Sequence, residues 1–332
     1  MTEQERFANY MRRARSTAMK SLYRYDKEVG QLYIDLAGQV TQELRSAHGL
    51  TEVHLKSVRS QLLKAANEAT RGFKTTLDKA LLEAADIQIE AVDGGMSPYW
   101  DKLYRTGLNP QAMLYKLPDE AVKLVYARVH ENGLMLSKSI WRLNQNTRQG
   151  LSRLVTEGVA RGFHYDDPRI VEQVERFLQP AKLNAKTMRA KKLQRVITRK
   201  LKDGSTYTFR QRPVSYDAAR LLRTEFGNAF KEASHLAAER NPACEGEQWI
   251  LSAFHPDIGC DCENYAQHDE GLGEGVYSVG NFPITPHACC LCGSQSVVMS
   301  MRDFMPLIEQ YMKGKPGVIS RWADKFEMEM AA

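Results

Sequence analysis

The sequence predicts an α+β fold that is predominantly α-helical, with long N-terminal helices and a smaller C-terminal mixed domain. Three observations lead to this prediction. Apolar residues recur at spacings of three and four through the first ninety residues, as they do on one face of a helix. Short β-prone runs stand near residues 200, 250 and 297. Five of the six cysteines fall between Cys260 and Cys292. A chain of 332 residues is long enough for two domains.

Residues 1–93 are expected to form a long helical hairpin. Gly49 is a suitable left-handed cap for the first helix, and Thr51 can cap the second. Asp93, Gly94 and Gly95 are expected to end the second helix. The apolar stripes consist of Val29, Leu32, Leu36, Val40 and Leu44, and of Leu55, Val58, Leu62, Ala66, Ala69, Phe73, Leu77 and Leu81. Such narrow stripes fit an antiparallel hairpin or a seam for partner helices, and we favour the hairpin.

Residues 94–181 are expected to be a second helical region. Residues 94–117 are rich in Gly, Pro and aromatic residues and predict a connecting loop. Helices are then expected from Pro118 to about residue 130, from Ser137 to Gly158, and over residues 168–178, where Asp167 supplies the N-cap.

Residues 182–214 are predicted to be a basic segment with a β-hairpin. The net charge of +6 is concentrated there, because residues 182–212 hold eleven basic side chains and one acidic one, Asp203. Two β-prone runs flank Asp203 and Gly204, which is typical of a hairpin. Residues 184–195 have few apolar side chains and fit either a helix or a mobile loop.

Clustered Lys and Arg side chains in this basic segment could contact DNA phosphates without reading sequence. An acidic protein partner or a solvated face explains them equally well. The candidate DNA-binding residues are Lys191, Lys192, Arg195, Arg199, Lys200, Lys202, Arg210 and Arg212.

Residues 215–332 predict the mixed domain. A helix is expected from Ser215 to about Arg240, followed by a short strand over residues 249–251 and a loop-rich stretch through Cys292. A second strand is expected over residues 296–299, and two helices close the chain.

The cysteines of this domain predict one structural zinc ion. Cys260 and Cys262 form one Cys-x-Cys pair, and Cys290 and Cys292 form another, so four thiolates are available for a tetrahedral site. His287 is the first substitute for Cys260 or Cys262. His255 is a weaker candidate, and Cys289 is expected to stay outside the site because adjacent residues rarely reach one ion.

The glycine-rich loop between the two pairs has little to bury, so a bound ion would replace the missing hydrophobic core. Two alternatives are reduced cysteines buried in a small core and a disulfide staple. The polar N-terminus lacks a hydrophobic signal region, and no apolar run approaches the roughly 18–20 residues of a membrane span. We therefore expect a cytoplasmic protein without disulfides or membrane association.

An ordered series of residues then resembles one family, the phage Mu F-like minor head proteins, also called phage head morphogenesis proteins. The series is Arg223-Thr224-Glu225, Trp249, His255-Pro256-Asp257, Cys260-Asp261, Gly275-Val276-Tyr277 and Pro286-His287-x-x-Cys290-x-Cys292. It spans residues 215–300, and residues 133–162 resemble the family less specifically. Ala288 stands where the family usually has Pro, and the first pair is Cys-x-Cys rather than Cys-x-x-Cys.

The resemblance implies a structural minor capsid protein that acts in procapsid assembly. It implies portal, capsid and scaffold proteins as partners, a place inside the virion head near the portal after assembly in the host cytoplasm, and room for non-specific contact with phage DNA. Copy number and oligomeric state stay open. Two other classes compete: a zinc-knuckle nucleic-acid-binding protein, and a metal-dependent hydrolase or nuclease in which Glu263, Asp269 or Glu270 would act as the base. No catalytic motif supports an enzyme.

Overall fold

The computed structural model describes residues 2–47, 52–130, 133–178, 195–200, 206–211, 213–252, 261–284 and 287–331, and for 195–200, 206–211 and 326–331 it describes the backbone alone. The chain forms two compact units. Unit 1 comprises Met1–Tyr23, Lys79–Arg128 and Arg223–Ala332, and unit 2 comprises Arg24–Asp78 and Val129–Leu222. Both units combine distant stretches of the chain, and the contiguous domains predicted from the sequence stay a prediction. In the described part of the chain, no helix is long and apolar enough to cross a membrane.

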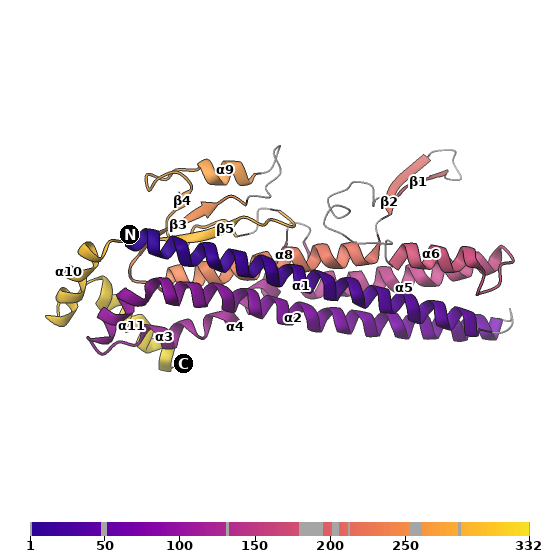
Figure 1. Ribbon diagram of the computed structural model, residues 1–332, viewed down its shortest axis with the longest axis horizontal. Helices are drawn as coiled ribbons and strands as arrows, with labels where there is room; N and C mark the ends of the chain where they lie inside the picture. Colours follow the sequence, from indigo (N-terminus) through magenta and orange to yellow (C-terminus); the bar gives the residue numbers. More distant parts are fainter. Residues whose placement is uncertain are drawn as a thin grey trace. The chain divides into compact units, whose positions relative to one another are not determined.

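Two long helices begin the chain, as predicted: α1 (Glu3–Ser46) and α2 (Glu52–Tyr104) (Figure 1). Their apolar stripes are buried within the chain, with Val29, Val40 and Leu62 inaccessible to solvent. In unit 2, Gly72 of α2 lies against Leu32 of α1, so the two helices pack on each other. This confirms the intramolecular interpretation of the stripes.

The predicted end of the second helix at Gly94 was wrong, because α2 continues through Gly94, Gly95 and Pro98 to Tyr104. A Cβ atom on Gly94 would lie 2.5 Å from the Tyr10 ring, and one on Gly95 would lie 2.7 Å from the Phe7 ring. Both glycines therefore allow α1 and α2 to approach closely in unit 1, and this packing outweighs the weak helix propensity of glycine. The loop expected over residues 94–117 is correspondingly shorter and contains α3 (Pro110–Leu114).

We expect Gly95→Ala to destabilise the protein by about 1–3 kcal/mol, because the added methyl group must displace the fully buried Phe7 ring. Gly38→Ala is the matched control, since Gly38 also lies inside a long helix but has nothing within 4 Å of an added Cβ. The control should stabilise by about 0.5–1 kcal/mol, the gain in helix propensity. Urea unfolding of both variants measures the two effects, and equal signs would contradict the packing argument.

Unit 2 also contains α5 (Leu136–Ala160), α6 (Pro168–Leu178) and a two-stranded antiparallel hairpin of β1 (Arg195–Lys200) and β2 (Thr206–Gln211). These elements were predicted. Asp167 caps α6 by accepting a hydrogen bond from the Arg169 backbone N–H at 2.9 Å. α8 (Val214–Glu239) begins in this unit and continues into unit 1.

Unit 1 carries a three-stranded antiparallel sheet with the order β4-β3-β5. Its strands are β3 (Cys244–Ile250), β4 (Val276–Tyr277) and β5 (Gly293–Val298). The helices of unit 1 besides α1, α2, α3 and α8 are α4 (Leu117–Ala127), α9 (Cys262–Gln267), α10 (Met301–Met312) and α11 (Val318–Ala331). The two closing helices and the strands around Trp249 and Ser296 match the sequence prediction, whereas β4 and α9 lie where a loop was expected.

The beginning of α1 protects the outer edge of this sheet, and Figure 1 shows the N-terminus beside β5. The Gln4 side chain accepts a hydrogen bond from the Val298 backbone N–H at 2.9 Å and donates one to the Ser296 carbonyl at 3.4 Å. Tyr99 of α2 donates its hydroxyl proton to the Met299 carbonyl at 2.5 Å. The first half of α1, the second half of α2 and the C-terminal sheet are therefore parts of one unit, although almost 300 residues separate Gln4 from Val298 in sequence.

Candidate metal centre

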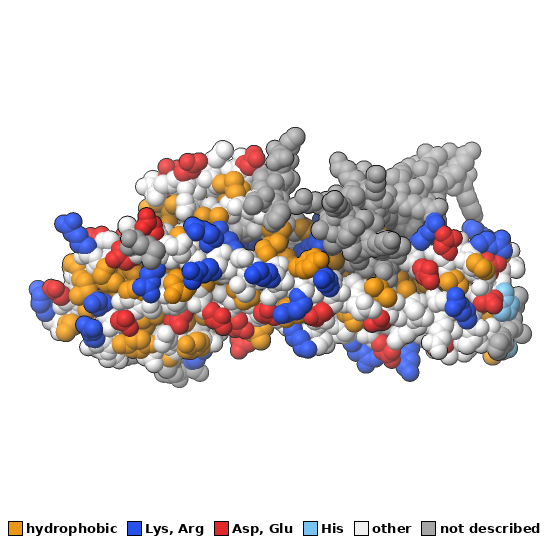
Figure 2. Space-filling view, viewed as in Figure 1, with side chains coloured by type: hydrophobic (Ala, Val, Ile, Leu, Met, Phe, Trp, Pro, Cys, Tyr) orange, Lys and Arg blue, Asp and Glu red, His pale blue; other side chains and the backbone are white. Residues whose placement is uncertain are grey.

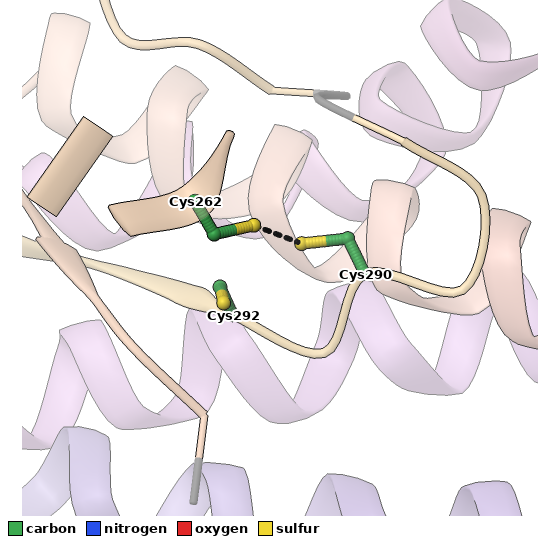
Figure 3. Close-up of side chains that lie close together, drawn as sticks. All are labelled: Cys262, Cys290 and Cys292. Carbon is green, nitrogen blue, oxygen red and sulfur yellow. Dashed lines mark hydrogen bonds between the residues drawn. The ribbon is translucent and has the colours of Figure 1, made fainter. Parts of the chain in front are cut away.

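Three cysteines from two separate segments meet next to the sheet of unit 1. Cys262 is the first residue of α9, and Cys290 and Cys292 lie on the segment that leads into β5. All three side chains are buried. In Figure 3 the sulfur atoms of Cys262 and Cys290 point toward each other, with Cys292 beside them. These are the cysteines that the structure brings together among those proposed from the sequence.

The distances suit a metal ion better than a disulfide. The Sγ atoms of Cys262 and Cys290 are 3.7 Å apart, and all three Sγ atoms lie within 4.8 Å of one another. A disulfide needs about 2.05 Å between its sulfur atoms. Two thiolates at about 2.3 Å from a tetrahedral zinc ion are separated by about 3.8 Å, which is close to the observed distance. The three buried cysteines could therefore bind a metal ion.

His287 is placed to provide a further ligand. Its Nε2 atom lies 3.1 Å from Cys262 Sγ, and its Nδ1 atom lies 3.0 Å from the Ala288 carbonyl oxygen. A carbonyl only accepts hydrogen bonds, so Nδ1 is the donor to Ala288, and Nε2 faces the sulfur atom of Cys262. Metal-binding histidines use this same arrangement, in which the second ring nitrogen donates to a carbonyl. Nε2 is not among the mutually close ligand atoms and would have to move nearer to Cys290 and Cys292.

A buried lysine of α8 interacts electrostatically with the cysteines of this cluster. Lys231 is completely buried, and its ammonium nitrogen lies 5.8 Å from the centre of the Trp249 ring. Burial lowers the pKa of Lys231, and the thiol groups of Cys290, Cys292 and Cys262 oppose this shift. A hydrogen bond from Cys292 lowers the pKa of Cys290 to about 5, with support from the charge of Lys231, while the same hydrogen bond raises the pKa of Cys292. The site thus already favours one thiolate, the form that binds metals.

Two close approaches position the segment that carries Cys290 and Cys292. A Cβ on Gly227 of α8 would lie 2.9 Å from the Cys290 carbonyl oxygen, and one on Gly293 would lie 3.0 Å from Arg15 Nε. Cys289 has φ = 60°, the left-handed region, and its backbone N–H donates to Thr224 Oγ1 at 3.0 Å. The half-buried Cys289 side chain lies outside the group of three close sulfur atoms. Among the described residues it is the only non-glycine with positive φ.

The loop between the cysteine pairs buries more than its glycines suggested. Tyr277 and Phe282 join Trp249 and the three cysteines in one hydrophobic cluster, against which Tyr265 packs. The Trp249 and Phe282 rings stack with their centres 5.3 Å apart, and Tyr277 donates its hydroxyl proton to the Tyr265 carbonyl at 3.0 Å. The expectation that this loop has little to bury was therefore wrong, because aromatic residues spaced along it converge on Trp249.

Asp269 and Glu270, two of the acidic residues proposed as the base of a hydrolase, form hydrogen bonds within the loop between the two cysteine pairs. Asp269 accepts hydrogen bonds from the Gly271 and Gly273 backbone N–H groups at 2.7 and 3.0 Å, and these bonds lower its pKa. Glu270 accepts from His268 and from Ser278, which also lowers its pKa. A general base needs a pKa near the working pH, so Asp269 and Glu270 are poor candidates. Glu263 is exposed on α9.

Several residues proposed from the sequence lie outside the described part of the chain. These are Cys260 and His255 at the candidate metal site, and Lys191, Lys192, Lys202 and Arg212 in the basic segment. Arg195, Arg199 and Lys200 lie on β1, and Arg210 lies on β2, where the structure describes the backbone only. The lone Cys244 lies on β3, and its thiol donates to the Gly246 carbonyl at 3.2 Å.

Searches with protein-family models, among curated proteins and among solved structures gave no significant match to this chain.

Sequence reasoning missed Lys231 and Gly227, although both lie on the predicted helix that begins at Ser215. Gly227 and Lys231 stand four residues apart and share one side of the helix. Asn228, Ser234 and His235 lie on the same side, so no apolar stripe predicted that this side is buried.

Proposed function

We propose that this chain is a structural minor head protein of a tailed phage, acting in procapsid assembly near the portal and contacting packaged DNA. The observation that carries the proposal is the convergence of the resembling residues. Trp249, Tyr277, Cys290 and Cys292, which are widely spaced in the ordered series, lie in one buried cluster. Thr224, from the helical part of the series, contacts Cys289 beside that cluster. If these residues build one site, members of the family would keep them together, in the same order along the chain.

Within this proposal the ion is one structural zinc, held by Cys262, Cys290 and Cys292 with His287 or Cys260 as the fourth ligand. Thiolate-rich sites select zinc among the common metals of the cytoplasm. The charges fit as well, because three thiolates and a neutral imidazole around Zn²⁺ leave one negative charge, which the buried Lys231 balances. Zinc would act as a cross-link between α9 and the segment before β5, not as a catalyst.

The two regions would have different tasks in an assembling head. The zinc-held knuckle and its aromatic cluster would form a rigid docking element, because its backbone is fixed by packing and by the ion together. The long helices α1 and α2 would present extended surfaces to the portal and scaffold proteins. The proposal includes no enzymatic step.

Co-expression with the portal protein of the same phage tests this function. We expect the chain to co-purify with the portal ring through size-exclusion chromatography and to be detected by mass spectrometry in purified virions. Its absence from virions, together with no association with the portal, would contradict the proposal.

One observation favours a second candidate, a metal-dependent hydrolase. A pocket of about 230 Å³ borders the cysteine cluster in unit 1 and is lined by Cys290, Cys292, Arg15 and Phe230 among others. A metal ion with only three protein ligands and an open position toward this pocket could activate water. Cobalt substitution separates the two candidates, since a four-ligand thiolate site and an open site with bound water differ in their visible absorption bands. Spectra of a saturated tetrahedral site would exclude the hydrolase.

A further inference from the structure

A groove in unit 2 gathers three arginines on two helices. It has a volume of about 440 Å³ and is lined by Arg59 of α2 and by Arg148 and Arg153 of α5. Gln145, Gln149, Ser152 and Thr156 add uncharged polar side chains, and Glu157 is the one acidic residue of the lining. The groove therefore combines an excess of positive charge with several neutral hydrogen-bonding groups.

The arginines of this groove have no carboxylate partner among the described residues. The Nε atom of Arg148 is buried and without a hydrogen-bond partner in the same part of the chain. Leaving the donor of a charged group buried and unpaired is costly, and an anion bound in the groove would remove this cost.

The charges of the two units differ in sign. Unit 2 contains 27 Lys and Arg against 15 Asp and Glu, whereas unit 1 contains 19 against 25. The basic segment over residues 182–212 belongs to unit 2 and supplies most of its excess. On the face shown in Figure 2, several basic side chains follow one another along α1, with acidic side chains beside them. A polyanion would therefore be drawn to unit 2, and the arginine groove lies in the described part of that unit.

We propose that the groove between α2 and α5 binds the phosphate backbone of double-stranded DNA. This rests on the proposed function, in which the protein contacts packaged DNA, and it assigns that contact to residues outside the basic segment. Arginine binds phosphate oxygens with two parallel hydrogen bonds, and Gln, Ser and Thr side chains commonly bind the same oxygens. Arg148 and Arg153 are five residues apart, about 7.5 Å along the helix axis, so they reach different phosphate groups. The contact reads charge and not base sequence.

Binding of the full-length protein to a fluorescent mixed-sequence duplex of about 30 base pairs, followed by anisotropy over a salt series, tests this assignment. We expect Arg59→Gln, Arg148→Gln and Arg153→Gln together to weaken binding at least about tenfold and to reduce the slope of log K against log salt by up to about 2.7. The matched control replaces Lys64, Lys138 and Arg142 by Gln. These residues are exposed on the same two helices but do not line the groove, so the control should change affinity less than about threefold.

Three results would overturn the assignment: no measurable binding by the unaltered protein, equal losses in the groove variant and its control, or equally tight and groove-dependent binding of poly-glutamate. The last result would identify an acidic polypeptide as the occupant. If the triple variant proves unfolded by circular dichroism, the pair Arg59→Gln and Arg153→Gln retains the partly buried Arg148 and should show up to about two thirds of the change in slope. If the groove does not bind DNA, co-purification with the portal still tests the proposed function independently.

Discussion

Replacing Cys290 and Cys292 by Ser is expected to abolish metal binding and to unfold the region around the cysteine cluster. The substitution removes two of the three close sulfur ligands and also two members of the hydrophobic cluster around Trp249. Structural zinc sites contribute roughly 10 kcal/mol or more in small zinc domains, so the loss exceeds what local packing alone supplies. Limited proteolysis measures the effect, and residues 261–298 should be cut much faster than in the unaltered protein.

A matched control for this experiment is Cys244→Ser, which removes a cysteine that lies outside the cluster. It should bind the metal fully and keep its protease resistance. Unit 2 contains none of these cysteines, so its helices should remain resistant in both variants. Unchanged resistance over residues 261–298 after loss of both Cys290 and Cys292 would contradict the idea that an ion staples this region.

Arg128→Met is expected to destabilise the protein by about 3–5 kcal/mol, because it leaves a buried carboxylate without its partner. Arg128 follows α4 and forms an ion pair with Glu232 of α8, whose side chain is 3% exposed. Burial lowers the pKa of Arg128, while the nearby Glu225 raises it. Chemical denaturation at constant pH measures the loss.

Two control variants separate the effect of breaking the buried ion pair from the effect of losing any arginine charge. Arg176→Met breaks an exposed ion pair with Glu172 on α6 and should cost less than about 1 kcal/mol. The double variant Arg128→Met with Glu232→Met removes both charges and should recover much of the loss, since replacing a whole buried pair by apolar side chains is often nearly neutral. If Arg128→Met costs no more than Arg176→Met, the buried pair does not hold α4 against α8.

Glu225 is a second buried carboxyl group on the same part of α8 as Glu232. Burial raises the pKa of Glu225 to about 7, and a hydrogen bond from Asn228 at 3.0 Å together with the charges of Arg128 and Lys231 partly offsets this. α8 thus carries three charged residues, Glu225, Lys231 and Glu232, inside unit 1. Charged partners of these side chains, such as Arg128, lie on other segments of the chain. Sequence periodicity along α8 therefore could not identify them.

Much of the fold could be predicted from sequence periodicity, because most helices carry an uninterrupted apolar stripe and a local end signal. The stripe from Val29 to Leu44 and the Asp167 cap of α6 are examples. The prediction failed where a local signal had a distant cause. Gly94 and Gly95 look like a helix end, but they serve the approach of Tyr10 and Phe7 about 85 residues earlier.

The candidate site could also be predicted only in part, because its cysteines follow a local spacing whereas its surroundings come from distant segments. Cysteine spacing indicated Cys262, Cys290 and Cys292, since paired thiols in a chain without other disulfide signals are typical of metal ligands. The aromatic cluster of Trp249, Tyr277 and Phe282 and the buried Lys231 depend on how β3, β4 and α8 meet. Such contacts between distant segments leave no periodic pattern in the sequence.

We propose that the buried cysteine cluster holds one zinc ion. Native mass spectrometry of the protein, expressed with zinc available and purified without chelators, tests it most directly. We predict a single mass shift equal to one zinc ion per chain, lost when Cys290 and Cys292 are replaced by Ser. Occupancy below about 0.3 ions per chain, or an ion that remains in the double variant, would contradict the claim.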